Sequence, residues 1–338
     1  MDLSPVTPPR AHSDGALRVA APLTALAYPA ILWCGVRISP VFVAASLIVP
    51  LLALLAAARL DGRYTPRARG IAHLAVAAPP LFSLLGGWLD FQHAIPLDSL
   101  RVWIPLWSAL AVIAAIERPR AAAVETDAAE AGAAKPAAAG SAGTPTASRR
   151  RLAVAHGVSA AVITLFALPH LVNHLGGLLG GDMHIAIMTA LRRVYRHALV
   201  EPVLLAAVAF QVASGAWLLR RKLARTAGWL DALQTTSGAY LLVFLLSHVS
   251  AALRARVRGG DPNWRWLAGG ELLTDPWSVR LVPYYFLAVI ALGLHAGCGL
   301  HTVLRGHRVA VRSSALLAIL TGLAAVASAL ILTGLFRA

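Results

Sequence analysis

The sequence predicts an all-α integral membrane protein with about nine transmembrane helices. Two observations lead to this class. Hydrophobic residues make up 58% of the 338-residue chain and charged residues only 13%, about half of the share that is typical of soluble domains. The apolar residues also lie in runs of about 20, which is the length that crosses a bilayer as a helix.

The predicted spans separate two membrane domains. They fall at 17–36, 39–58, 70–89, 102–117, 152–178, 199–220, 230–253, 282–304 and 313–335. Residues 119–150 are rich in Ala, Gly and Pro, a composition typical of linkers. The division is therefore a polar tail at 1–16, a four-span domain of unknown role at 17–118, this linker, and a five-span domain at 151–338.

The net charge of +15 is explained by membrane topology rather than by nucleic-acid binding. One set of loops holds most of the basic residues: Arg59, Arg63, Arg67, Arg69, Arg118, Arg120, Arg149, Arg150, Arg151, Arg220, Arg221, Lys222, Arg225, Arg305, Arg308 and Arg312. The opposite set is richer in acids. The positive-inside rule then predicts a bacterial inner-membrane protein with its N-terminus cytoplasmic and its C-terminus outside.

Histidine is the expected ligand for any metal in this chain. The two cysteines, Cys34 and Cys298, both lie in apolar segments. The sequence contains neither the CxxCH motif of a covalently attached haem nor a cysteine cluster for an iron–sulfur centre.

An internal repeat in the five-span domain places histidines inside two spans. Ser159 to His170 reads SAAVITLFALPH, and Ser237 to His248 reads SGAYLLVFLLSH. Both stretches have Phe four residues before the His and Leu two before it. The two following spans also align, with Gln211 on His295 and Gly215 on Gly299. The spans at 152–178 and 199–220 therefore resemble those at 230–253 and 282–304.

These positions predict a haem site in the outer half of the bilayer. The spans that carry His170 and His248 run in the same direction, so the two side chains reach the same depth, with His174 one turn beyond His170 on the same face. Two histidines at equal depth can bind one haem iron from both sides. Alternatively, histidines within membrane helices serve proton relays or helix–helix hydrogen bonds.

A second haem would need a different set of ligands near the inner face. His295 lies in the inner half of its span, and Gly299, one turn later on the same face, leaves space for a flat macrocycle; Gly215 offers the same gap on the span at 199–220. Gln211 stands where the matching histidine would be, so His301 or another group would have to supply the second ligand.

Other histidines have simpler explanations. His73, near a span end, is expected to serve packing or to lie at the membrane surface, and His184 is expected to be solvated. Residues 183–198 show an apolar stripe opposed by arginines, which predicts an amphipathic helix on the outer surface.

The residues Ser237-Gly238, His295-Ala-Gly-Cys-Gly299-Leu and LPHLVNHLGG (168–177) resemble the membrane-anchor cytochrome b of succinate dehydrogenases and fumarate reductases. The resemblance covers about residues 151–308. It implies one or two haem b groups, with His170, His248 and His295 as iron ligands. It also implies a quinone near Ser237 and Gln234, and a flavoprotein or iron–sulfur partner on the inner side.

Three features depart from that family. Gln211 stands where a haem ligand is expected, the Arg that commonly precedes Ser-Gly is absent, and the first four spans have no counterpart. His156 and Ser159 form the repeat's version of the inner-end site, either as a proton path to a quinone or as ordinary interfacial residues.

The leading hypothesis is therefore a b-type cytochrome that exchanges electrons with the quinone pool. Such a chain would be an electron-transfer subunit of an oxidoreductase complex rather than an enzyme alone. The alternative is a haem-free transporter or membrane scaffold, whose repeats also give internal pseudo-symmetry. A haem or redox sensor is a third reading, although the chain shows no output domain.

Overall fold

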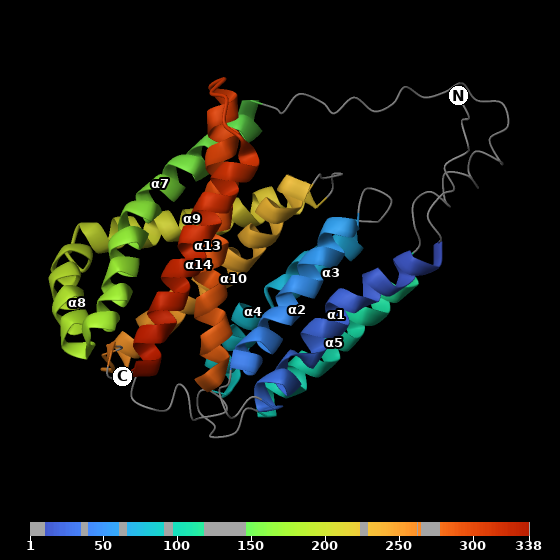
Figure 1. Ribbon diagram of the computed structural model, residues 1–338, viewed down its shortest axis with the longest axis horizontal. Coiled ribbons are helices and arrows are strands. Elements are labelled where there is room, and N and C mark those ends of the chain that lie inside the picture. Colours follow the sequence, from blue (N-terminus) through green and yellow to red (C-terminus); the bar gives the residue numbers. More distant parts are fainter. Residues whose placement is uncertain are drawn as a thin grey trace.

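The computed structural model describes residues 11–34, 40–60, 66–90, 97–117, 147–223, 229–261, 263–264 and 278–337. Within these ranges all regular structure is helical, which confirms the predicted all-α class. Most of the predicted linker, at 118–146, lies outside the described residues. The helices form an N-terminal group and a C-terminal group that lie side by side (Figure 1).

The N-terminal group contains five helices and one π-helical turn. They are α1 (Ala11–Cys34), α2 (Pro40–Arg59), α3 (Pro66–Val76), α4 (Ala78–Leu85), η1 (Gly86–Asp90) and α5 (Leu97–Ile116). The C-terminal group contains α7 (Ala147–Leu175), η2 (Gly176–Leu179), α8 (Gly181–Tyr195), α9 (Val200–Lys222), α10 (Trp229–Val257), η3 (Ser278–Arg280), α13 (Leu281–Gly306) and α14 (Ser313–Arg337).

Six helical stretches in the described residues are long and apolar enough to cross a membrane. Five of them are the predicted spans of the C-terminal domain, and the sixth is α5. The bent pair formed by α3 and α4 brings the number to seven if the pair is one span. Helices α1 and α2 coincide with the first two predicted spans, but only Ser46–Arg59 of α2 meets the apolar criterion, as a helix shorter than a span. The total of nine spans thus stays a prediction.

The predicted span at 70–89 is broken in two. Helices α3 and α4 meet at an angle of 74°. Two consecutive prolines, Pro79 and Pro80, lie in the first turn of α4. Proline has no N–H to give to the preceding turn and disfavours helical geometry in the residue before it, so a helix ends here and another begins.

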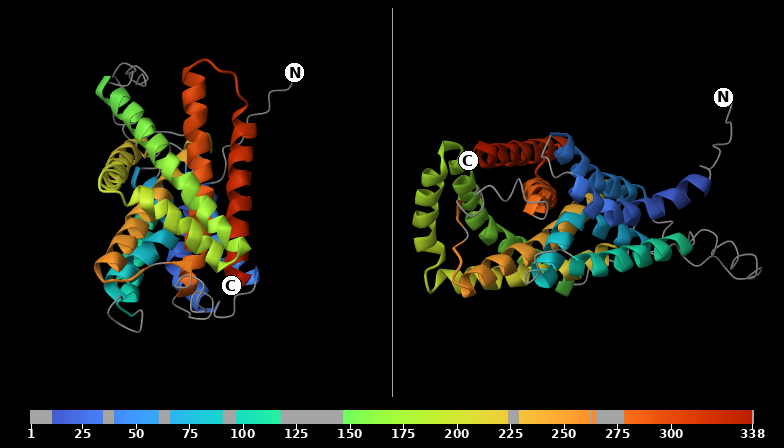
Figure 2. Two further views of the ribbon diagram at one scale, coloured as in Figure 1. Left: turned by 90° about the vertical axis from the view of Figure 1, so that its left-hand side faces the viewer. Right: turned by 90° about the horizontal axis from the view of Figure 1, so that it is seen from below.

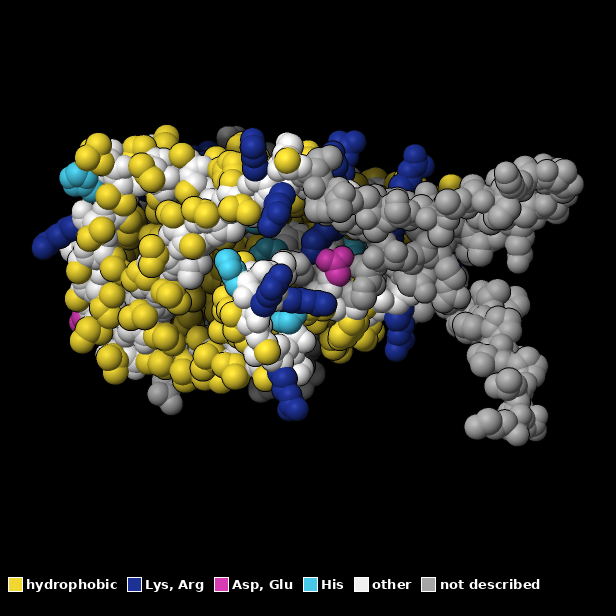
Figure 3. Space-filling view, turned by 90° about the horizontal axis from the view of Figure 1, so that it is seen from above, with side chains coloured by type: hydrophobic (Ala, Val, Ile, Leu, Met, Phe, Trp, Pro, Cys, Tyr) yellow, Lys and Arg dark blue, Asp and Glu magenta, His cyan; other side chains and the backbone are white. Residues whose placement is uncertain are grey.

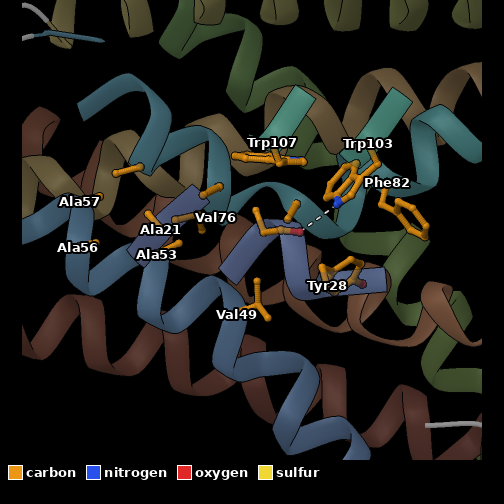
Figure 4. Packing of buried hydrophobic residues seen from close by; sticks show 14 of the residues in the cluster. Ala21, Tyr28, Val49, Ala53, Ala56, Ala57, Val76, Phe82, Trp103 and Trp107 are labelled. Carbon is orange, nitrogen blue, oxygen red and sulfur yellow. Dashed lines mark hydrogen bonds between the residues drawn. The ribbon is translucent and has the colours of Figure 1, made fainter. Parts of the chain in front are cut away.

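The N-terminal group has an aromatic core (Figure 4). The rings of Tyr28, Phe82, Trp103 and Trp107 are fully or almost fully buried. Each ring contacts the next in this order, with 5.9, 5.1 and 5.4 Å between the centroids of successive rings. The Trp103 indole N–H donates to the Ala25 carbonyl at 3.0 Å, which satisfies its one polar atom and ties α5 to α1.

Basic side chains gather at the end of the molecule where α7 begins (Figure 3). The exposed arginines of the loops and helix ends there are Arg150, Arg151, Arg220, Arg221, Arg305, Arg308 and Arg312. The arginine-rich loops expected on one side of the membrane thus lie at one end of the molecule. We call this end of the molecule inner and the opposite end outer.

The two groups of helices make polar contacts at both ends of α10. Towards the inner end, buried His73 of α3 hydrogen-bonds Thr236 of α10, with 2.9 Å between Nδ1 and Oγ1. Towards the outer end, the Arg254 guanidinium donates to the Gly87 carbonyl and lies over the Trp88 ring, 4.6 Å from its centre. His73 therefore packs between the two groups, and α10 makes most of the contacts between them, while α13 also touches α2 and α4.

The C-terminal group is built from two helix pairs. Helix α7 packs on α9, and α10 packs on α13, with α14 against α13 and η2. Helix α8 exists as predicted but turns back along the outer half of α7, where Tyr195 meets Phe166 with 5.4 Å between ring centroids. It therefore covers other helices rather than lying apart on the surface (Figure 2).

We expect Trp103→Ala to destabilise the protein by about 3–5 kcal/mol, because it removes a fully buried ring and a hydrogen bond from the aromatic core. The measurement is thermal unfolding of the purified protein in detergent. Trp33→Ala, which removes a ring that is 53% exposed on α1, is the matched control. Equal losses in the two variants would contradict this account of the core.

Candidate functional site

The C-terminal bundle contains two polar clusters, one in each half. The outer histidine cluster consists of His170, His174, His184 and His248. The inner polar cluster consists of His156, Gln211, Ser214, Gln234, Ser237 and His295. Together they contain the histidines that the sequence singled out as candidate ligands, except His301, which lies further along α13 outside both clusters.

His170 and His248 come together in the outer half. Their ring centroids are 6.1 Å apart, with 65° between the ring planes. Each ring also stacks on the phenylalanine four residues earlier, His170 on Phe166 and His248 on Phe244, at interplanar angles of 22° and 10°. The two stretches that match in sequence thus give the two histidines the same local setting.

The outer histidine cluster continues from His170 towards the surface. The ring of His174 lies 4.7 Å from that of His170 and 5.3 Å from that of His184. His184 Nε2 lies 3.4 Å from His174 Nδ1 and 3.2 Å from the amide nitrogen of Asn173. Four imidazoles therefore form a continuous chain from the middle of the bundle to α8.

The expectation that His184 is solvated is wrong, because its side chain is only 2% exposed. Helix α8 turns back along α7 and brings His184 against Asn173 and His174, while Trp264 covers it with a ring-centroid separation of 4.7 Å. The contact depends on the turn between α7 and α8. The sequence offered only a weak signal for it, namely a histidine on the apolar stripe of α8.

Several buried polar atoms of the outer region make no hydrogen bond. They include Asn173 Oδ1, His184 Nδ1 and Trp264 Nε1. The Trp264 nitrogen is a donor, and the His184 Nδ1 is a donor when Nε2 accepts from the Asn173 amide. Unsatisfied buried donors are costly and usually mark a missing partner, so this end of the cluster is suited to an acceptor such as a carboxylate.

The described residues contain no group of three or more His, Cys, Asp or Glu side chains arranged to hold a metal ion. A haem iron needs only two ligands from the protein, since the porphyrin supplies the other four. An imidazole nitrogen binds a metal at about 2 Å. With about 1 Å from each nitrogen to its ring centre, two imidazoles on opposite sides of one iron would have centres about 6 Å apart. The 6.1 Å between His170 and His248 fits this arrangement.

His295 lies in the inner half, hydrogen-bonded to α10. Its Nδ1 is 3.1 Å from the main-chain carbonyl oxygen of Gln234 and 3.3 Å from Ser237 Oγ. A carbonyl can only accept, so Nδ1 carries the proton and Nε2 keeps its lone pair. In this tautomer the Nδ1 hydrogen bond fixes the ring, and the Nε2 lone pair is able to bind a metal.

His156 has the corresponding contacts on the other helix pair. Its Nδ1 lies 2.8 Å from Ser214 Oγ, whose own proton goes to the Phe210 carbonyl. The Nδ1 is therefore the donor, and Nε2 accepts from the Gln211 amide nitrogen at 2.9 Å. The Gln211 Oε1 is buried without a hydrogen bond.

The glycines of the inner half have different neighbours. Gly215 lies beside His156, whereas a side chain at Gly299 would meet open space. A Cβ at Gly238, which follows Ser237, would come within 2.9 Å of His295 Cε1, so this glycine lets the ring approach α10 closely. Gly238 is thus the residue that makes room for His295.

The structure places the predicted quinone-site residues within hydrogen-bonded contacts. Ser237 is buried against His295, and the Gln234 side chain accepts from Lys222, while Ser159 donates to the Ala207 carbonyl. The neighbouring cavity, lined in part by Arg69, His73 and Lys222, has a volume of about 10 Å³. It has room for about one water molecule, so it does not fit a quinone ring.

We expect protonation of His184 to destabilise the fold. Burial, with a smaller contribution from nearby Arg192, lowers the pKa of His184 to about 4. An unfolded histidine has a pKa near 6.5, so stability is highest above about pH 6.5 and falls as the pH drops towards 4, by at most about 1.4 kcal/mol per pH unit. Thermal unfolding of wild type and His184→Gln at about pH 7.5 and about pH 5 measures the effect.

The wild type should lose more stability on acidification than His184→Gln. His197→Gln, which changes an exposed histidine on the turn before α9, should behave like the wild type. The same pH dependence in His184→Gln and wild type would show that His184 is not buried in its neutral form.

Comparisons of the chain with models of protein families, with curated proteins and with solved structures gave no significant match.

Proposed function

We propose that this chain is a membrane b-type cytochrome that transfers electrons as a subunit or anchor of an oxidoreductase complex. One observation carries the proposal: His170 and His248, on two helices with matching sequences, have ring centres 6.1 Å apart. This separation suits two axial ligands of one haem iron. A haem bound there would supply one-electron chemistry, and the protein would set its position and potential.

The surroundings support the same assignment. The stacked rings of Phe166 and Phe244 hold the two imidazoles in place and supply apolar walls. The two helices that carry these histidines pack mainly on other helices and little on each other. Helix α7 packs mainly on α8, α9 and α14, and α10 packs mainly on α13, α9 and the N-terminal group. The unsatisfied buried donors His184 Nδ1 and Trp264 Nε1 suit the propionate carboxylates of a haem.

The direction of electron flow and the partners belong to the proposal as well. We propose electron exchange with the quinone pool and with a flavoprotein or iron–sulfur subunit on the inner side. The exposed arginines of that side would favour an acidic partner surface. We further propose the bacterial inner membrane as the location, with the arginine-rich end cytoplasmic. The quinone site does not coincide with the small cavity beside Lys222.

We expect His170→Ala and His248→Ala each to remove the outer haem, because one axial ligand does not hold a low-spin iron in this site. The measurement is haem content per chain together with the reduced-minus-oxidised absorption spectrum of the purified full-length variants. His197→Ala, which changes an exposed histidine, should keep the wild-type spectrum. A full, unshifted haem spectrum in both His170→Ala and His248→Ala would rule out this ligand pair.

A haem-free transporter is the second candidate, and two observations favour it. The chain of four imidazoles from His248 to His184 could carry protons, and the break between α3 and α4 resembles the broken helices of transporters. The two candidates differ in a direct measurement. Wild-type protein that carries no haem, yet moves protons when reconstituted in vesicles, would favour the transporter.

A further inference from the structure

We propose that His174 and His184, together with the side-chain amide of Asn173, bind a transition-metal ion, zinc or copper, at the outer end of the C-terminal bundle. This inference is independent of the proposed haem, because the pair formed by His170 and His248 takes no part in it. The argument comes from the turn that brings the three side chains together, from the distances between their polar atoms and from the charges around them.

A glycine-rich turn places His184 against the end of α7. Helix α7 continues through η2 and Gly180 directly into α8. Gly180 has a φ of +110°, a conformation that glycine adopts without strain. A Cβ at Gly176 would come within 2.7 Å of a side chain of α8, so this glycine lets α8 pack closely on the turn. As a result His174 and His184, ten positions apart in the sequence, are in contact.

The polar atoms of the three side chains converge on His184 Nε2. This nitrogen lies 3.4 Å from His174 Nδ1 and 3.2 Å from the Asn173 amide nitrogen. Hydrogen bonds from nitrogen donors are usually about 2.7–3.2 Å long, so both contacts are at or beyond the upper end of that range. Two nitrogens that each lie about 2.0–2.1 Å from one tetrahedral zinc ion are about 3.3 Å apart. The separations therefore suit two ligands of a shared metal ion.

The hydrogen-bonding capacity of the imidazoles leads to the same conclusion. A neutral imidazole has one N–H and one lone pair. The Nδ1 of His184 is buried without a hydrogen bond, whereas its Nε2 has two polar neighbours. A single proton or lone pair on Nε2 serves only one of these neighbours well. A metal ion between the two rings would use the lone pairs of both His174 Nδ1 and His184 Nε2, and so remove this conflict.

The Asn173 amide can supply an oxygen as the third ligand. This side chain is only 4% exposed, and its Oδ1 makes no hydrogen bond. A half-turn of the amide exchanges Oδ1 with the nitrogen and points the oxygen towards His184 Nε2. The site then has two imidazoles and one oxygen, which favours zinc or copper over magnesium and calcium, because the latter prefer oxygen ligands alone. A water molecule would complete a tetrahedral zinc site.

The surroundings of His184 are compatible with a bound cation. Burial lowers the pKa of His184 to about 4, so the imidazole is neutral at pH 7 and its lone pair is available. Arg192 acts on His184 electrostatically and would by itself oppose a cation. Asp261 offsets that charge, since its Oδ1 lies 2.6 Å from an Arg192 guanidinium nitrogen. The Trp264 ring covers the imidazole, with 4.7 Å between ring centroids, and its face favours a positive charge.

A metal ion in this position would have two effects on the molecule. It would join α8 to α7 and so hold α8 over the outer histidine cluster. It would also occupy both lone pairs between the rings of His174 and His184, so a proton could not pass from one ring to the other. The site would therefore interrupt the chain of four imidazoles at its outer end.

Metal binding to the full-length protein tests the inference. Protein without a histidine tag is stripped with a chelator, given Zn²⁺ alone, and examined by titration calorimetry and elemental analysis. The wild type should bind one zinc ion per chain and unfold at a higher temperature with zinc than without it. His174→Gln and His184→Gln should each weaken this binding more than about tenfold, because loss of an outer-shell partner alone costs that much. His197→Gln, which changes an exposed histidine, is the matched control and should bind zinc as the wild type does.

A conservative variant covers loss of folding. Asn173→Asp offers a carboxylate oxygen in place of the amide and should bind zinc more tightly than the wild type, whereas a purely structural amide predicts no gain. With Cu²⁺, electron paramagnetic resonance should show two imidazole nitrogens in the wild type and in Asn173→Asp. Wild type that binds neither metal would overturn the inference, and so would unchanged affinity in both His174→Gln and His184→Gln. The haem content of the same samples tests the cytochrome proposal separately.

Discussion

The cost of burying an imidazole inside an apolar bundle is the constraint on which the rest of this structure depends. A polar side chain in a membrane span must find a partner there, because neither lipid nor water supplies one. In the outer half the partners of His170 are other aromatic rings, His174, His248 and Phe166. In the inner half His156 and His295 hydrogen-bond neighbouring helices. Every pairing joins helices or holds a ring in place, so the histidines also organise the bundle.

The internal repeat buries a histidine twice in similar surroundings. Helices α7 and α10 each present a Phe–His pair in the outer half and a polar residue 14 positions earlier in the inner half. The N-terminal group takes no part in these pairs. It packs an aromatic core of its own and contacts α10 through His73 and Gly87. One helix, α10, therefore belongs both to the histidine sites and to the contact between the groups.

The sequence predicted the features that depend on local spacing. The Ser-to-His stretches predicted that His170 and His248 would face each other, and the apolar runs predicted the five helices of the C-terminal domain. The features that the sequence did not predict depend on how the helices are arranged in the tertiary structure. His184 becomes buried only because α8 folds back along α7, and His156 meets Gln211 only because α7 pairs with α9. The break before Pro79 had a sequence signal, the proline pair itself, although the span around it reads as continuous.

The most direct test of the central claim is the reduced-minus-oxidised absorption spectrum of purified wild-type protein, expressed with an adequate haem supply and with haem quantified per chain. The account predicts the α-band of a low-spin b-type haem with both axial positions filled by histidine, at a content of at least one haem per chain. Protein that is folded, shown by cooperative thermal unfolding, and yet carries no haem would contradict the account.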